Sequence, residues 1–449
     1  MAISDRGIPV HALVLAGLLL AITSAAKGQS NMLRDHRLGF IGISFDDGNW
    51  SHYVNAFPIM EKYRVKGVFA VCAGGFAREP GGRGCITGAQ CQELYRAGHE
   101  IMDHTWRHES GIWSDAGTVE QWTQQTEASL AVFKALGVTV RGWNLPGGAS
   151  NVRDTTTGQM IRKDSVYTRD LQSFLRRHYD YSRGYTDSFG NAPFNLCWNF
   201  RGDPHYFSGV YSSWESVARM ENGRTTRENA EAAVRSLKTS RADALQRGVY
   251  VGFCFHEVTD EKHSRWALEE LCRWIAENDL PNTTYGQAID AFRNPRKFYP
   301  EDIEQIPCAD FQYDLDGNGR PDGWEGCAFA PEEVKGLGKS RVAQFRDGTT
   351  AYIYGPERGE TRISFQLRSP DGQPVKGRLQ VTGVDVLDQH ARSPRHTLAE
   401  VGFEAGGEWR EVSATFPVAE RNEHCAIRFS VDGDRPVRVT SPSWRRVKK

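Results

Sequence analysis

Two adjacent carboxylates at the end of a strand-like run constrain this chain more than any other feature. The run Ile41–Phe45 leads directly into Asp46, Asp47 and Gly48. Gly48 lets the backbone turn. Two like charges side by side are costly, so a fold tolerates them most readily where a cation lies between them or where one is a reacting base. For the pair alone, the alternative interpretation is an acidic turn after a strand.

Two histidines further along the chain indicate that the carboxylates belong to a metal site. His104 and His108 are four positions apart. Two imidazoles at this spacing and one carboxylate from elsewhere in the chain are typical ligands of the zinc ion in hydrolases, which has three protein ligands and an open position for water. We therefore predict that Asp47, His104 and His108 bind Zn²⁺, or iron, cobalt or nickel in its place. A His-x-x-x-His pair without the upstream carboxylates would be an incidental surface feature.

At this point the chain resembles a known family. Ser-Phe-Asp-Asp-Gly at 44–48, Gly-His-Glu-Ile at 98–101 and His-Thr-Trp-Arg-His at 104–108 are similar to motifs of the polysaccharide deacetylases with a NodB-homology domain, carbohydrate esterase family 4. The resemblance covers roughly residues 38–296. It implies a distorted (β/α) barrel with seven or eight strands, and it assigns the role of general base to Asp46, beside a metal-activated water.

The resemblance also suggests the general acid. Gly252–His256 ends on a histidine after an apolar strand and is similar to the family's late Leu-x-His motif, with Cys254 in place of the leucine. His256 would protonate the leaving amine or alcohol; a structural histidine is the alternative. For the residue that orients this histidine, Asp180 and Asp203 are both candidates.

The third family motif, Arg-x-Pro-x-Gly, is altered. The chain has Asn144 where the arginine belongs but keeps Pro146. The resemblance places Asn144, Pro146 and Gly147 in the binding part of the site, with the Gly147 N–H beside the oxyanion. The family arginine pairs with the catalytic aspartate, and an amide supplies no charge, so we expect the pKa of Asp46 to be less depressed here.

Alternation of strands and helices predicts an α/β domain over residues 35–300, with parallel strands. Asp46, His104 and His256 all follow strands, and functional residues of such folds lie at the C-terminal ends of strands. Capping-box patterns begin at Thr87 and Thr118. The strands expected from the pattern are 41–45, 67–72, 101–102, 138–140 and 249–255, and the helices include 54–63 and 227–246.

Beyond Pro300 the helical periodicity ends, and short alternating runs such as Thr361–Leu367 and Trp409–Phe416 follow. Their spacing predicts an all-β sandwich over residues 305–449. The stretch 407–412 is similar to jelly-roll carbohydrate-binding modules. A sandwich that only stabilises or spaces the enzyme is the alternative.

An acidic loop begins the second domain. Its sequence satisfies the Asp-x-Asp-x-Asn-Gly…Glu spacing of calcium loops. Pro321 and non-helical flanks exclude a true EF-hand, so the pattern is typical of the isolated calcium loops of extracellular β-domains. A metal-free acidic linker is the alternative. The expected Ca²⁺ ligands are Asp314, Asp316, Asn318, Arg320 through its carbonyl, Asp322 and Glu325.

The N-terminus indicates export. Arg6 precedes the apolar stretch Ala12–Ile22, and the small residues at 24–26 are typical of those before a signal-peptidase cleavage site. We therefore predict a signal peptide over residues 1–28. The apolar stretch is too short to span a bilayer, and the mature protein is expected to be secreted or periplasmic, without a membrane span. The formal charge of −1 offers no field to attract nucleic acid.

An exported protein can form disulfides. The chain has 9 cysteines, and we favour the pairs Cys85–Cys91 and Cys308–Cys327. Cys254 is expected to be a small buried hydrophobe.

Together these features predict an exported, metal-dependent hydrolase that removes acetyl groups, above all N-acetyl groups, from an acetylated polysaccharide. An O-acetyl esterase of the xylan type is the alternative within the enzyme class. A catalytically impaired glycan-binding protein of the same fold is the alternative outside it, and Asn144 supports that alternative.

Overall fold

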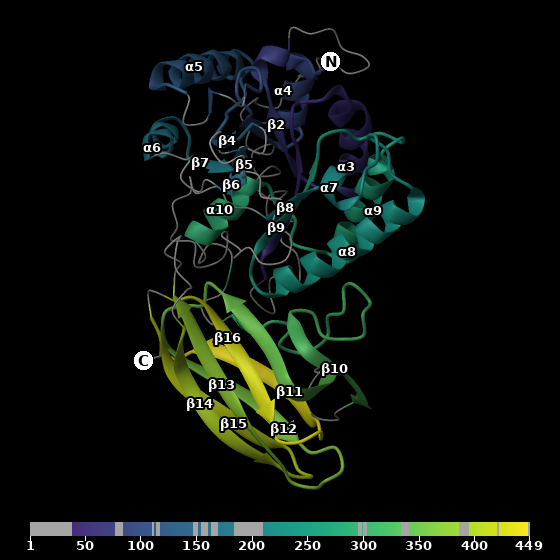
Figure 1. Cartoon of the computed structure of the whole chain (residues 1–449), viewed down its shortest axis with the longest axis vertical. Coiled ribbons are helices and arrows are strands. Elements are labelled where there is room, and N and C mark those ends of the chain that lie inside the picture. The colour runs from purple at the N-terminus through teal and green to yellow at the C-terminus, as the bar shows by residue number, and fades with distance from the viewer. Residues whose placement is uncertain are drawn as a thin grey trace, which may run out of the picture.

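The computed structural model places an α/β domain and an all-β domain one after the other along the long axis of the molecule (Figure 1). This architecture confirms the fold class predicted from the sequence. The predicted signal peptide at 1–28 lies outside the described residues. These are 38–76, 84–109, 112–113, 117–146, 151–153, 160–162, 169–183, 210–294, 299, 303–333, 341–385, 395–419 and 422–447.

Seven strands form the central sheet of the α/β domain, in the order β7-β4-β3-β2-β1-β9-β8. All neighbouring pairs are parallel. The inner strands β1, β2 and β9 are buried along their whole length, as their apolar sequences require of strands covered on both faces. The strands are β1 (Phe40–Phe45), β2 (Gly67–Val71), β3 (Glu100–Asp103), β4 (Gly142–Asn144), β7 (Tyr181–Arg183), β8 (Val210–Ser213) and β9 (Tyr250–Phe255), and a separate antiparallel hairpin joins β5 (Asn151–Arg153) and β6 (Met160–Arg162).

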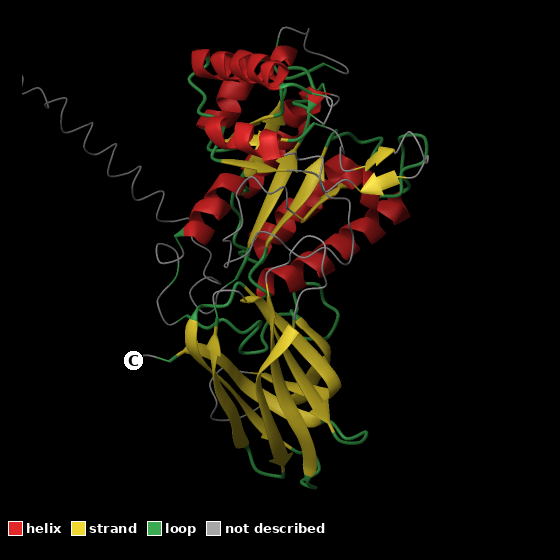
Figure 2. Ribbon diagram, turned by 60° about the vertical axis from the view of Figure 1, so that its left-hand side comes forward, coloured by secondary structure: helices red, strands yellow, loops and turns green. Residues whose placement is uncertain are grey.

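Helices alternate with these strands and pack around the sheet (Figure 2). The predicted capping boxes are confirmed at Thr87 and Thr118, where each side chain accepts the N3 backbone N–H. No helix among the described residues is both long and apolar enough to cross a membrane. The helices are α3 (Phe57–Tyr63), α4 (Gly88–Arg96), α5 (Val119–Ala135), α6 (Arg169–His178), α7 (Trp214–Val217), α8 (Arg227–Gln246), α9 (Ser264–Glu277) and α10 (Tyr285–Arg293), with a π-helical turn at His52–Ala56 and a 3₁₀ turn at Ala73–Gly75.

The parallel sheet is strongly curved. β7 lies four positions from β1, and at the usual spacing of about 4.8 Å a flat sheet would separate these strands by about 19 Å. Arg183 on β7 nevertheless reaches β1, where its Nη1 lies 3.2 Å from Oγ of Ser44. One arginine side chain cannot span such a flat sheet, so the sheet curls into the partly closed barrel that the family resemblance implied.

The all-β domain is one antiparallel sheet in the order β14-β13-β16-β11-β17-β12-β15, with β10 paired to β11. Its outer strands β14 and β15 contact each other, so the sheet nearly closes around its core. Aromatic side chains fill that core, among them Trp324, Phe345, Phe429 and Trp444. The strands are β10 (Trp324–Glu333), β11 (Arg341–Tyr354), β12 (Gly359–Arg368), β13 (Val375–Asp385), β14 (Arg395–Ala405), β15 (Arg410–Val418), β16 (Asn422–Val431) and β17 (Val437–Arg446).

The strand predicted at 138–140 is wrong. The Val138 N–H donates to Phe133 and completes the end of α5, so the next strand begins only at Gly142.

The favoured disulfide pairs are also wrong, because all eight described cysteines are free. Cys91 lies on the buried face of α4, in the core. The Cys308 sulfur accepts the Tyr313 N–H instead of bonding Cys327. Cys254 is fully buried, as predicted.

Candidate active site

The candidate site lies where the parallel strands end. Asp46 follows β1, His104 follows β3, Asn144 and Arg183 end β4 and β7, and His256 follows β9. The C-terminal ends of parallel strands meet at one edge of a sheet, and the curvature of this sheet draws that edge together. Side chains distant in the sequence therefore converge on one place.

The predicted metal ligands come together there. The candidate ligand atoms of Asp47, His104 and His108 all lie within 4.8 Å of one another. Nε2 of each histidine lies 3.2 Å from the same Asp47 oxygen, Oδ1. His104 is buried, whereas the side chains of Asp47 and His108 are 41% and 39% exposed. The set is therefore anchored in the protein on one side and open to solvent on the other.

Two of these three residues have a left-handed backbone. Asp47 has φ 78° and His108 has φ 60°, and Thr105, in the turn between the histidines, has φ 70°. The Thr105 hydroxyl accepts the His108 N–H at 3.0 Å and holds this turn. Side chains other than glycine rarely adopt such conformations, and those that do are concentrated at functional sites where the surroundings enforce them.

Asn144 contacts the metal-ligand set. Nδ1 of His104 lies 3.1 Å from the Asn144 backbone oxygen and 3.0 Å from its amide nitrogen. When Nδ1–H donates to the backbone oxygen, Nε2 keeps its lone pair facing Asp47. An outer partner of this kind fixes the tautomer and orientation of a metal-ligating histidine. Asn144 thus orients His104, a role that the sequence analysis did not foresee.

The cation beside Asp46 is Arg183. Nη2 of Arg183 lies 2.5 Å from Oδ1 of Asp46, and the arginine is fully buried. Burial opposes ionisation of Asp46, but the positive charge of Arg183 and of nearby histidines outweighs it and holds the pKa of this carboxyl well below its usual value. The expectation that Asn144 leaves Asp46 without charge stabilisation is therefore wrong. Arg183 was not predicted from the sequence. Its position as a charged residue at the end of a short strand could have indicated a functional role.

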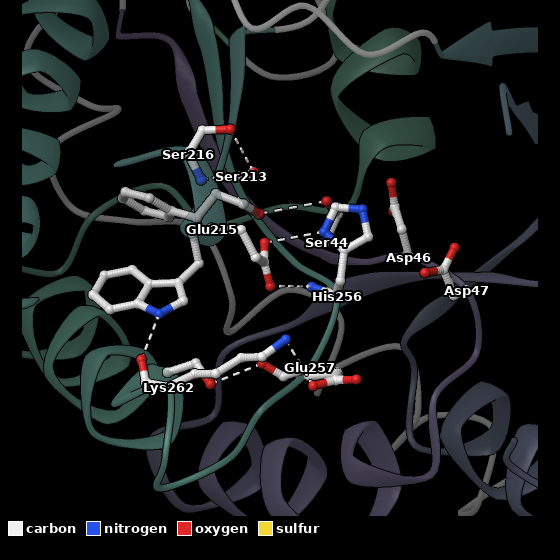
Figure 3. A network of polar contacts seen from close by, with 12 residues as sticks. Ser44, Asp46, Asp47, Ser213, Glu215, Ser216, His256, Glu257 and Lys262 are labelled. Carbon is white, nitrogen blue, oxygen red and sulfur yellow. Dashed lines mark hydrogen bonds and ion pairs between the residues drawn. The ribbon is translucent and has the colours of Figure 1, made fainter. Parts of the chain in front are cut away.

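Glu215 orients the histidine. Its Oε2 lies 3.0 Å from Nδ1 of His256, and in Figure 3 the imidazole lies between Glu215 and the aspartates Asp46 and Asp47. Burial favours the neutral imidazole, but the hydrogen bond to Glu215 and the nearby carboxylates raise the pKa of His256 to about 9. Glu215 was not predicted either. Its position just after the end of β8 could have indicated a functional role.

Neither candidate predicted for that role occupies it. Asp180 accepts from Arg141 at 2.8 Å on the exterior of the domain. Arg141 also pairs with Asp290 and so is not a partner of Asp46. Asp203 lies outside the described residues.

Backbone contacts hold the Glu215–His256 pair in place. Glu215 lies in the short helix α7, which Ser213 caps by accepting the Ser216 N–H. The neighbouring Trp214 anchors the helix, since its indole donates to the Lys262 carbonyl at 2.8 Å. Nε2 of the buried His52 lies 2.8 Å from the His256 carbonyl oxygen. These contacts therefore fix the positions of both Glu215 and His256.

A pocket of about 230 Å³ opens beside the metal-ligand set. Asp47 and His108 line it together with Asn49 and Arg107, so a ligand in the pocket would contact the set directly. Pro146 is buried just beyond β4. Gly147, expected at the oxyanion, lies outside the described residues.

The predicted calcium ligands are only partly together. The carboxylates of Asp314, Asp316 and Asp322 have oxygens within 4.8 Å of one another. Glu325 lies in β10 instead and pairs with Arg247 at 2.8 Å. As a ligand of this loop, the prediction for Glu325 is wrong.

Comparison with known proteins finds a family match in the first part of the chain. Residues 34–163 match the family model described as polysaccharide deacetylase. The matched span contains the metal-ligand set and Asp46, whereas Arg183, Glu215 and His256 lie beyond it. No curated protein matches the chain.

Several solved structures are similar at low sequence identity. The Xyl-CE4 domain of a multidomain xylanase from the hindgut metagenome of Trinervitermes trinervoides is 15% identical, with a TM-score of 0.34 over 56% of this chain and 90% of that one. The catalytic domain of peptidoglycan N-acetylglucosamine deacetylase from Eubacterium rectale is 16% identical, with a TM-score of 0.35 over 58% and 92%. The CBM22-1 xylan-binding domain from Paenibacillus barcinonensis is 12% identical, with a TM-score of 0.24 over 28% and 88%.

Proposed function

We propose that this chain, which contains a polysaccharide deacetylase domain over residues 34–163, hydrolyses N-acetyl groups of a polysaccharide. The observation that carries the proposal is the convergence of three groups at one edge of the sheet. They are the metal-ligand set, the ion-paired Asp46 and the hydrogen-bonded His256. Each supplies one requirement of amide hydrolysis: a Lewis acid, a base and an acid.

The donor set fits a divalent transition metal. Two imidazole nitrogens and one carboxylate are typical ligands of hydrolytic zinc sites. The Asn144 backbone oxygen lies where it can accept from Nδ1–H of His104, the tautomer in which Nε2 ligates a metal. Iron, cobalt or nickel suit the same ligands. When bound, the metal supplies Lewis acidity, which polarises an acetyl carbonyl and lowers the pKa of water.

Asp46 acts as the general base. It is ionised at neutral pH, and its neighbour Asp47 belongs to the metal-ligand set. It accepts a proton from the attacking water, a role that typically contributes about 10²–10⁴-fold to the rate. Arg183 is a positioning residue, since it fixes one oxygen of this carboxylate.

His256 acts as the general acid. A pKa of about 9 keeps the imidazole protonated at neutral pH, with Nδ1 donating to Glu215. In the proposed mechanism, Nε2–H of the same ring protonates the leaving group. An amine leaves an amide only after its nitrogen is protonated, whereas an alcohol leaves an ester more easily. A histidine held in its acidic form therefore favours N-acetyl over O-acetyl substrates.

The structure gives the glycan-binding alternative little support. It rested on Asn144, but Arg183 supplies the charge that Asn144 lacks. It also relied on surface tryptophans for binding sugars, yet Trp324 and Trp444 of the β-domain are fully buried. The third tryptophan, Trp409, is only partly exposed and lies beneath the Arg368 guanidinium.

The proposal includes export. The apolar stretch Ala12–Ile22 after Arg6 supports a signal peptide and hence a secreted or periplasmic enzyme. An acetylated polysaccharide is then the substrate and partner.

Acetate release from N-acetylglucosamine oligosaccharides and from acetylated xylan tests the proposal. The zinc-loaded protein should release acetate from the oligosaccharides, lose this activity with a chelator and regain it with Zn²⁺. Release from acetylated xylan alone would replace the amide assignment with the esterase one. Binding of either glycan without any release would favour the glycan-binding alternative.

A further inference from the structure

A second cluster of carboxylates lies far from the catalytic groups along the chain, in the loop before β10. Oxygens of Asp314, Asp316 and Asp322 lie within 4.8 Å of one another. The loop is tightly turned around them, with Gly317 at φ 73° and Gly319 at φ 79°. Acidic clusters are common without a metal ion. The case for a metal site therefore depends on how buried each carboxylate is and on whether its oxygens have hydrogen-bond partners.

Asp322 is the informative member. It is 1% exposed. Its Oδ2 accepts the Leu315 N–H at 2.9 Å, whereas its Oδ1 has no hydrogen-bond partner within the described part of the structure. A buried carboxylate oxygen without a partner is costly, and buried polar atoms are almost always satisfied. The carboxylate that carries it has an oxygen within 4.8 Å of oxygens of Asp314 and Asp316, so a cation bound by the cluster would lie beside it.

The local charge also favours a cation. The carboxylates of Asp243, Asp314 and Asp316 all add negative charge around that of Asp322. Asp243 belongs to α8 of the other domain, so both domains contribute negative charge. Arg247 and Arg320 are the cations near Asp243. The Arg247 guanidinium is already paired with Glu325.

The same loop joins the two domains. The Gly323 N–H donates to Oδ1 of Asp243 at 2.7 Å, and the Trp274 indole on α9 donates to the Leu315 carbonyl at 3.1 Å. On the other side, the loop leads directly into β10 of the β-domain, next to α8 in Figure 1. Whatever fixes the loop therefore also fixes the contact between the domains.

We propose that residues 314–322 bind one Ca²⁺ through the carboxylates of Asp314, Asp316 and Asp322, and that this ion fixes the junction between the two domains. Carboxylate oxygens are the ligands that Ca²⁺ prefers, and a set of oxygens only does not favour zinc. Asn318 is not included among the ligands, because its amide nitrogen donates to Asp316 at 2.7 Å and its side-chain oxygen accepts the Arg320 N–H. Glu325 is not part of the site, which distinguishes it from an EF-hand loop.

Terbium luminescence of the full-length protein tests the binding. Tb³⁺ replaces Ca²⁺ in oxygen sites, and Trp274 at the Leu315 carbonyl would sensitise its emission. Tryptophan-excited emission should appear in wild type, fall when Ca²⁺ is added, and be lost in Asp322→Asn and Asp316→Ala. It should persist in Asp47→Asn, which alters only the catalytic set, and in Asp434→Asn, an exposed aspartate of the β-domain. Undiminished emission in folded Asp316→Ala and Asp322→Asn would overturn the site.

Limited proteolysis of the full-length protein tests the junction. Ca²⁺ should slow cleavage within residues 303–323 severalfold in wild type and raise the melting temperature, because a ligand that binds only the folded state stabilises it. Neither effect should occur in Asp316→Ala, whose substituted side chain is not buried. Calcium binding with unchanged cleavage and melting would overturn the role at the junction.

Discussion

The guanidinium of Arg183 reaches the carboxylate of Asp46 from the strand next to Asn144. Arg183 on β7 and Asn144 on β4 are register partners, so the two residues occupy the same level of the sheet. Their contacts differ: Arg183 holds Asp46 and Asn144 holds His104. The positive charge beside Asp46 thus comes from Arg183 on β7, one strand away from Asn144, where the family resemblance led us to expect an arginine. Asn144 contacts the predicted metal ligand His104 instead.

Replacing Arg183 by methionine should move the acidic limb of the pH–rate profile to higher pH. The base works only when ionised, and loss of the adjacent cation raises the pKa of Asp46, by about 1–3 units for an arginine neighbour. Arg183→Lys should shift the limb less, because it keeps the charge. The measurement is kcat/KM for acetate release as a function of pH.

Folding must be checked in this variant, because removing one partner of a buried ion pair costs about 3–5 kcal/mol. Arg141→Met, which breaks ion pairs outside the site, is the control and should leave the limb in place. The double variant Asn144→Arg/Arg183→Asn returns the cation to the motif position and should recover part of the shift. An unmoved acidic limb in folded Arg183→Met would show that this arginine does not act on the base.

Glu215→Gln should move the alkaline limb of the same profile to lower pH. The carboxylate of Glu215 helps to raise the pKa of His256 to about 9, and activity falls as the acid deprotonates above that pKa. Without the negative charge, the pKa falls and activity is lost earlier on the alkaline side. Asp180→Asn is the matched control, since Asp180 pairs only with Arg141 among the contacts described for it. Equal profiles for Glu215→Gln and wild type would exclude this role.

His104→Ala should abolish metal binding. His104 is the buried member of the set and is fixed by Asn144, so its loss removes the best-oriented ligand. Elemental analysis of the purified protein gives the metal content, and His178→Ala on α6 is the control. Full metal occupancy in His104→Ala would refute the ligand assignment.

Local sequence patterns predicted most of the elements that carry the site. Asp46, His104 and His256 each follow an apolar run, and a strand end is where an α/β fold places functional groups. The capping boxes at Thr87 and Thr118 were also predictable, because a cap involves only residues close in the sequence.

The partners of Asp46 and His256 could not be predicted, because they depend on how the sheet curves. Arg183 is four strand positions from Asp46 and reaches it only across the curled sheet. Glu215 meets His256 because β8 lies beside β9, a pairing that the sequence does not encode locally. The family resemblance pointed instead to Asn144 beside Asp46, and to Asp180 or Asp203 beside His256. For the same reason, spacing in the sequence assigned Glu325 to the calcium loop, although Arg247 of the other domain pairs with it.

Asp46→Asn tests the central claim most directly, when metal content and acetate release are measured on the same preparation. The account predicts that this variant keeps the metal of wild type, because Asp47, His104 and His108 are intact, and that acetate release from N-acetylated oligosaccharides falls by about a hundredfold or more. Loss of the metal would mean that Asp46 is a ligand and not the base. Undiminished acetate release by the metal-loaded variant would contradict the proposed mechanism.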